Sequence, residues 1–246
     1  MGILALGYGL LAYVVFFATF LYAIAFVGNL PVPQSIDVGG VASPTGTALL
    51  INLVLLSVFA IQHSVMARPG FKKAWTRIVP ESVERSTYVL LSSGALILMY
   101  WMWRPMTGVV WSLEGSMVGG ILTALFWLGW LVVLLSTFMI NHFDLFGLRQ
   151  VWLRFKGQEY TYSNFVMRWL YNYVRHPIML GFLIAFWATP VMTMGHLLFA
   201  VMTTGYIVIA LQLEERDLVA VHGETYQEYQ STTPMLIPFT KGRGGA

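Results

Sequence analysis

The chain has 246 residues, of which 57% are hydrophobic and only 10% are charged. Soluble domains carry about 25% charged residues, so this composition excludes an ordinary soluble globule. Its charge-free stretches are as long as the roughly 20 apolar residues that cross a hydrocarbon core, which indicates a polytopic membrane protein. Cysteine is absent, which excludes disulfides, thiolate metal sites and a cysteine nucleophile. The net charge of +3 is too small to suggest a nucleic-acid partner.

Apolar runs in chain order predict an all-α transmembrane helix bundle, within a single integral membrane domain over 1–246. The first run is longer than the apolar region of a signal peptide, so we expect it to be retained. A fifth run is too long for one span and is interrupted by Pro190 and Gly195, which predicts a tight helical hairpin. The chain then has six spans, or five if the shorter arm of the hairpin does not cross fully. The runs are 3–27, 48–66, 88–103, 118–140 and the hairpin 178–213.

The basic residues predict the orientation of the chain. Thirteen of the 14 Lys and Arg residues lie in the polar segments 67–86, 141–177 and 214–246, and only Arg104 lies in a connection on the other side. Basic residues stay preferentially on the cytoplasmic side of a membrane. We therefore expect these three segments and both termini to face the cytoplasm.

Polar residues near the membrane boundary are the first candidates for a site. His63 lies near the end of the second run, where a functional role and an interhelical hydrogen bond explain it equally well. Segment 141–150 follows the fourth run and combines His142, Asp144 and Arg149. An interfacial helix start with a snorkelling arginine would explain this segment. We favour a functional role because ionisable groups so close to hydrocarbon usually have one. His-x-Asp alone is a weak metal pattern, so no metal is proposed.

Arg175, His176 and Pro177 directly precede the hairpin. Proline is favoured at the first helical position and disfavours the helical conformation in the residue before it, so His176 should cap a helix that starts at Pro177. A helix start beside a guanidinium can bind a carboxylate or phosphate. From these three residues alone, a basic turn at the membrane surface is the simpler interpretation.

Glu214 and Glu215 end the hairpin. On a continuing helix Glu215, Tyr226 and Tyr229 would share one face, although Gly223 weakens an unbroken helix. The two acids are either solvated or hold a cationic or hydroxyl-bearing ligand on which tyrosines stack.

The order of these motifs resembles the isoprenylcysteine carboxyl methyltransferase superfamily, to which NnrU-like proteins also belong. Its enzymes are integral membrane proteins that bind S-adenosyl-L-methionine in a cytoplasmic pocket, and the resemblance covers roughly the last third of the chain. It implies this cofactor, with the carboxylate of its methionine part near Arg175 and its ribose or amino group near Glu214 or Glu215. The residues implied in cofactor binding are Tyr171, Arg175, His176, Pro177, Gly181, Glu214, Glu215, Tyr226 and Tyr229.

The earlier part of the chain, in segments 62–68 and 141–150, is similar to the bacterial methanethiol S-methyltransferases. This similarity implies methylation of a small apolar thiol, methanethiol to dimethyl sulfide, in the inner membrane of a bacterium. His142, oriented by Asp144, is the first choice for the base that deprotonates the thiol, and His63 is the second. Arg149 would stabilise the thiolate or hold the carboxylate in place. Besides membrane lipid, no obligate protein partner is expected.

Three alternatives stay open. A sibling methyltransferase would act on another lipophilic thiol, a carboxylate or a phenol, and would not need His142 or Asp144. A non-enzymatic NnrU-like membrane protein would not bind the cofactor. A transporter is disfavoured because the polar residues gather toward one membrane face and not at the midplane.

Overall fold

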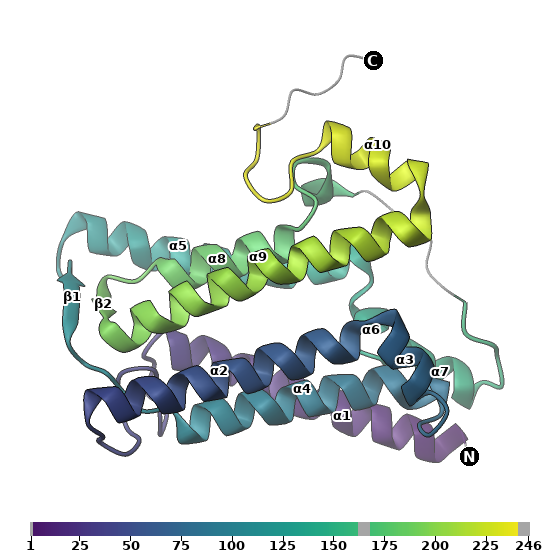
Figure 1. Cartoon of the computed structure of the whole chain (residues 1–246), viewed down its shortest axis with the longest axis horizontal. Helices are drawn as coiled ribbons and strands as arrows, with labels where there is room; N and C mark the ends of the chain where they lie inside the picture. Colours follow the sequence, from purple (N-terminus) through teal and green to yellow (C-terminus); the bar gives the residue numbers. More distant parts are fainter. Residues whose placement is uncertain (1, 162–167, 241–246) are drawn as a thin grey trace. The chain divides into compact units, whose positions relative to one another are not determined.

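The computed structural model describes residues 2–161 and 168–240, and this part of the chain is helical apart from one small sheet (Figure 1). The chain divides into two compact units, and each is described by itself. The first unit comprises Met1–Val110, Asn141–Ser163 and Met192–Phe199, and the second comprises Trp111–Ile140, Asn164–Val191 and Ala200–Ala246.

The first unit is a bundle of three long helices with short helices at one end. In this unit α4 packs against both long neighbours, while the short α7 packs against α1 and α4. A Cβ added at Gly9 of α1 would lie 2.5 Å from Val151 Cγ2 of α7, so glycine permits this close approach. The helices are α1 (Gly2–Val27), α2 (Thr45–Ala67), α3 (Pro69–Trp75), α4 (Glu81–Met102), α6 (His142–Leu145) and α7 (Leu148–Phe155).

The second unit is organised around the packing of α8 on α5. Gly129 of α5 faces Gly181 of α8, and an added Cβ at either glycine would lie 2.7 Å or less from backbone of the other helix. The helices are α5 (Met117–Ile140), the 3-10 helix η1 (Trp169–Asn172), α8 (Pro177–Trp187), most of α9 (Met194–His222) and α10 (Glu224–Thr232). Two short strands, β1 (Val109–Ser112) and β2 (Val191–Thr193), pair into the sheet.

Four helices of the described chain, α1, α2, α5 and α9, are long and apolar enough to cross a membrane, so this is a multi-pass membrane protein. The hairpin is unequal. Its first arm α8 has 11 residues, or about 16 Å at 1.5 Å per residue, which is too short for a hydrocarbon core of about 30 Å. At this length the shorter arm is not a full span by itself, and α4, which contains most of the predicted run 88–103, is not among the four helices named above. α9 continues to His222, nine residues beyond the predicted end of the apolar run.

Candidate functional site

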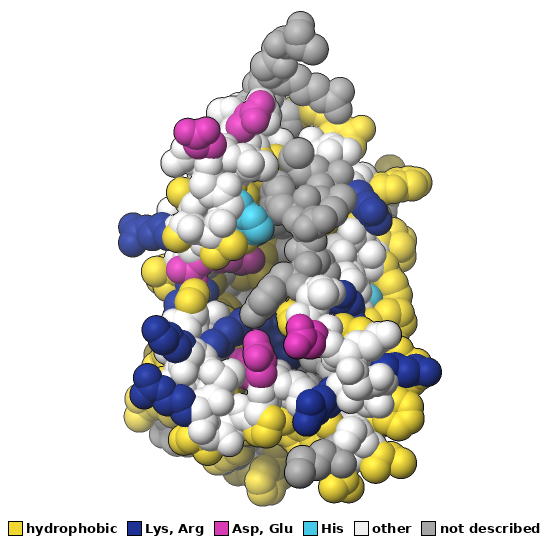
Figure 2. All heavy atoms as spheres, turned by 90° about the vertical axis from the view of Figure 1, so that its right-hand side faces the viewer, with side chains coloured by type: hydrophobic (Ala, Val, Ile, Leu, Met, Phe, Trp, Pro, Cys, Tyr) yellow, Lys and Arg dark blue, Asp and Glu magenta, His cyan; other side chains and the backbone are white. Residues whose placement is uncertain are grey.

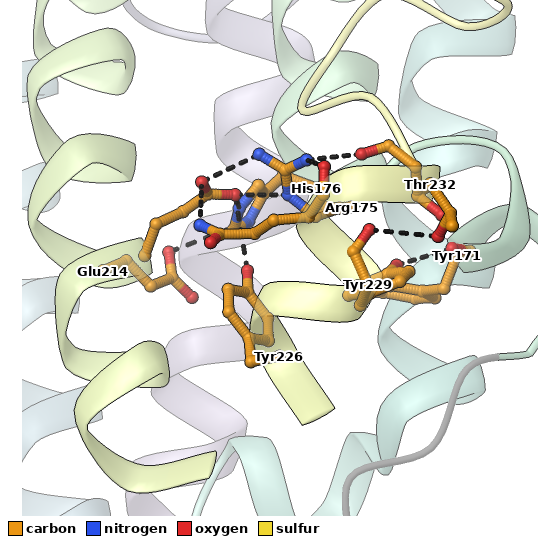
Figure 3. A network of polar contacts seen from close by, with 10 residues as sticks. Tyr171, Arg175, His176, Glu214, Tyr226, Tyr229 and Thr232 are labelled. Atoms are coloured by element: carbon orange, nitrogen blue, oxygen red, sulfur yellow. Dashed lines mark hydrogen bonds and ion pairs between the residues drawn. The ribbon is translucent and has the colours of Figure 1, made fainter. Parts of the chain in front are cut away.

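Arg175 is the centre of a polar network in the second unit (Figure 3). It lies two residues before α8 and is 8% exposed. Its Nε and Nη2 donate to the two carboxylate oxygens of Glu215 at 2.6 and 2.8 Å. Its Nη1 donates to the carbonyl oxygens of Gln230, at 3.2 Å, and of Thr233. This bidentate, charge-assisted arrangement joins α8 to α9 and to the end of α10.

The Glu215 carboxylate has further partners besides Arg175. His176 Nε2 lies 3.0 Å from Oε1, and the Tyr226 hydroxyl donates to the same oxygen at 3.3 Å. Gln230 Nε2 donates to Oε2 at 2.9 Å. A mostly buried ion pair is maintained only when additional hydrogen bonds satisfy its remaining atoms, and this pair has them.

Glu214, one residue earlier on α9, has a different environment. Its side chain is 46% exposed, against 13% for Glu215, and its Oε2 lies 4.0 Å from His176 Nδ1. Consecutive helical residues point about 100° apart, so the two carboxylates face different surroundings. Of the two acids predicted to bind the cofactor, Glu214 is therefore accessible to solvent and Glu215 is enclosed.

Three tyrosines lie beside this network. The Tyr229 hydroxyl donates to the Tyr171 carbonyl oxygen at 2.5 Å, and the rings of Tyr226 and Tyr229 meet edge to face at 5.8 Å. Burial raises the pKa of each of the three phenols above its ordinary value, so they stay protonated at neutral pH.

Backbone turns at both ends of the network bring these residues together. α8 begins at Pro177 with His176 at the N-cap position, as predicted. Gly223 has φ of 58° and separates α9 from α10. The prediction that Glu215, Tyr226 and Tyr229 share one face of a continuing helix is therefore wrong. The turn nevertheless returns Tyr226 to Glu215. Gly181, predicted near the cofactor, lies against α5.

The predicted catalytic residues belong to the first unit. Figure 2 shows charged side chains gathered at the end of this unit that carries α3 and α7. His142 begins α6 and is 6% exposed. Its Nε2 lies 2.8 Å from the Tyr13 hydroxyl, and its ring packs on Phe146 with centroids 4.9 Å apart. Burial lowers the pKa of His142 below its ordinary value.

Asp144 and Arg149 lie close together, as segment 141–150 suggested. Asp144 Oδ1 lies 3.6 Å from Arg149 Nη1, and both carboxylate oxygens accept from the Tyr160 hydroxyl, at 3.1 and 3.2 Å. Arg149 also lies over the Tyr160 ring, 5.3 Å from its centroid, and donates to the Thr161 carbonyl and hydroxyl oxygens at 2.6 and 2.7 Å.

His63 makes the interhelical hydrogen bonds that one of its two interpretations expected. Its Nε2 lies 2.9 Å from the Tyr88 hydroxyl of α4, and its Nδ1 lies 3.1 Å from Ser92 Oγ. These contacts to Tyr88 and Ser92 explain the polar His63 ring inside the first unit, and no ligand is needed to explain it.

Four network members were missed in the sequence: Tyr13, Tyr160, Gln230 and Thr233. Tyr13 lies in the middle of an apolar span, where a lone phenol has no neighbouring polar motif. The others act from segments whose position depends on tertiary packing, and Gln230 and Thr233 accept from Arg175 through backbone carbonyl oxygens, which carry no sequence signal.

Comparisons with known proteins agree over most of the chain. The family model described as NnrU protein matches residues 50–233. The chain is 59% identical to a protein of Mycobacterium tuberculosis named methanethiol S-methyltransferase, over 94% of this chain and 95% of that relative. It is 56% identical to methanethiol S-methyltransferase 2 of Bradyrhizobium diazoefficiens (94% and 88% covered) and 53% identical to methanethiol S-methyltransferase of Crocosphaera subtropica (94% and 91%). No solved structure matches significantly. The chain therefore belongs to the NnrU family, within the group that contains proteins named methanethiol S-methyltransferase.

Proposed function

We propose that this protein is an S-adenosylmethionine-dependent methyltransferase that converts methanethiol to dimethyl sulfide. The observation that carries the proposal is the 59% identity to a protein named methanethiol S-methyltransferase, which extends over nearly the full length of both chains. The proposed location is the inner membrane of a bacterium, with both termini and the three basic segments on the cytoplasmic side.

The second unit supplies residues that suit the cofactor. S-adenosylmethionine carries a sulfonium, an ammonium and a carboxylate, and when bound it supplies a methyl group on an excellent sulfur leaving group. Glu214 offers an accessible carboxylate to a cationic or hydroxyl-bearing ligand. Tyr171, Tyr226 and Tyr229 offer neutral aromatic rings in the same network, and aromatic faces attract cations.

The first unit supplies a candidate base. A thiol with a pKa near that of cysteine, about 8.5, is mostly protonated at neutral pH, so a base accelerates its methylation. Burial lowers the pKa of His142 and therefore favours the neutral imidazole. In this proposal, the His142 imidazole accepts the thiol proton, and its Nε2 lies 2.8 Å from the Tyr13 hydroxyl oxygen. Tyr13 therefore orients the ring, while Asp144 and Arg149 hold segment 160–161 against α6 and α7.

The proposal is tested with purified protein in detergent, S-adenosylmethionine and a panel of thiols, with methyl sulfides measured in the headspace. We expect dimethyl sulfide from methanethiol and cofactor binding by calorimetry. Turnover of larger thiols but not of methanethiol would favour a sibling methyltransferase. Neither turnover nor cofactor binding would contradict the enzyme assignment and favour the non-enzymatic alternative.

Orientation is testable because the natural chain contains no cysteine. Single cysteines at two exposed positions, Lys73→Cys and Glu114→Cys, are treated with a membrane-impermeant maleimide in spheroplasts. The proposed topology predicts labelling of Glu114→Cys in intact spheroplasts and of Lys73→Cys only after permeabilisation. The reverse pattern would refute the cytoplasmic location of the basic segments.

A further inference from the structure

We propose that Glu214 and Glu215 have separate roles: Glu214 recognises the positively charged sulfonium of the cofactor, and Glu215 with Arg175 positions the residues around it. This inference rests on the proposed function, because it concerns how S-adenosylmethionine is recognised. It starts from the hydrogen-bonding capacity of each side chain in the second unit.

The Arg175–Glu215 pair has almost no capacity left for a ligand. An ionised carboxylate has about four lone-pair sites, and that of Glu215 is approached by two nitrogens of Arg175 and by His176, Tyr226 and Gln230. A guanidinium has about five N–H donors. Four of them are used by the Glu215 carboxylate and by the carbonyl oxygens of Gln230 and Thr233. A ligand carboxylate on Arg175 would have to displace protein partners.

The same contacts show what the pair positions. Glu215 holds the His176 ring and the Tyr226 hydroxyl, while Arg175 holds the carbonyl oxygens at the end of α10. These residues come from three segments that meet only after the Gly223 turn. The pair is therefore a buried clamp, and its removal should disturb the second unit even without a ligand.

Glu214 remains as the carboxylate whose charge is not neutralised by an arginine. In the described part of the chain, the ion pair of Glu214 within 4.0 Å is with His176, whose Nδ1 lies 4.0 Å away. Its negative charge contributes to raising the pKa of Tyr171 and of Tyr226, after the larger effect of burial, which places the carboxylate within electrostatic reach of both phenols. An exposed carboxylate beside neutral aromatic rings suits a cation. S-adenosylmethionine has one positive charge more than its product, S-adenosylhomocysteine.

The test compares two adjacent, isosteric variants, Glu214→Gln and Glu215→Gln. Calorimetry measures binding of S-adenosylmethionine and of S-adenosylhomocysteine, and thermal unfolding is measured without ligand. For Glu214→Gln we expect an unchanged melting temperature. Its affinity for S-adenosylmethionine should fall about fivefold or more, as for one lost charge interaction near 4 Å. Its affinity for S-adenosylhomocysteine should change less than about twofold. For Glu215→Gln we expect a lower melting temperature and an equal loss of affinity for both ligands. Its KM for the cofactor should rise while kcat at saturating cofactor is retained.

Two results would overturn the inference. If Glu214→Gln loses affinity equally for both ligands, recognition of the sulfonium charge is refuted. If its melting temperature falls as much as that of Glu215→Gln, the separate roles are refuted. The proposed function fails in a different way, because the unmodified protein would then bind neither ligand. The comparison of melting temperatures remains informative in that case.

Discussion

Replacing Gly181 by alanine tests whether this glycine serves helix packing or contact with the cofactor. A Cβ at this position would lie 2.7 Å from Gly129 O, 2.8 Å from Val133 Cγ2 and 2.9 Å from Val133 N. Two of these three atoms are backbone and cannot rotate away. To reach an ordinary contact near 3.4 Å, α5 and α8 would have to separate by roughly 0.5–0.7 Å.

The expected magnitude follows from two opposing effects. Overpacking of a close contact costs about 1–3 kcal/mol, whereas alanine gains up to about 1 kcal/mol over glycine inside a helix. We expect a net loss of about 1–2 kcal/mol in the free energy of unfolding. For a chain of this length, that loss lowers the melting temperature by about 2–8 °C.

Thermal unfolding in detergent provides the assay, and Gly120→Ala is the matched control. Gly120 also lies in α5, but an added Cβ there meets nothing within 4 Å, so this variant should be as stable as the natural protein or more stable. If Gly181→Ala is as stable as the control, the close crossing of α5 and α8 is refuted. If it keeps its stability but loses cofactor affinity, Gly181 contacts the cofactor.

Further predictions concern the first unit. His142→Ala should lower kcat about 10²–10⁴-fold, the usual range for a general base, with cofactor affinity by calorimetry nearly unchanged; normal turnover would exclude His142 as the base. Burial lowers the pKa of folded His142 below about 6.5 in the unfolded chain, so its contribution to stability is present above that pH and is lost as the pH falls toward the folded value. Melting temperatures between about pH 8 and 5 should therefore fall less steeply in His142→Gln, and parallel curves would refute this. Tyr160→Phe removes the bifurcated hydrogen bond from its hydroxyl to the two Asp144 carboxylate oxygens and should cost about 1 kcal/mol of stability with cofactor affinity retained; an unchanged melting temperature would show that this network contributes little.

The long spans were predictable because hydropathy reports directly on the membrane. The runs 3–27 and 118–140 differ by only one residue at their predicted starts from α1 and α5. The run 88–103 was less accurate, since α4 begins at Glu81. A helix that continues beyond the membrane keeps its backbone hydrogen bonds in water, so hydropathy marks the end of the apolar run and not the end of the helix.

The helix start at Pro177 was predictable for a local reason. Proline fixes its own φ and restricts the residue before it, so His176-Pro177 specifies a boundary without help from tertiary structure. The orienting partner of His142 was not predictable in this way. Tyr13 is 129 residues away in sequence, and only the packing of the first unit brings its hydroxyl to the imidazole.

The two adjacent acids show why a motif can identify a site without assigning its roles. Glu214 and Glu215 share a charge, a helix and a place in the motif, and they differ only in direction by about 100°. Which of them becomes enclosed depends on where α10 returns, and that return depends on the positive φ of Gly223. Burial then favours whichever acid meets Arg175, because an enclosed carboxylate without a cation is costly. The other acid stays accessible and, among the described residues, is not neutralised by an arginine, so the enclosure of Glu215 by Arg175 leaves Glu214 as the carboxylate that the proposal assigns to a cationic ligand.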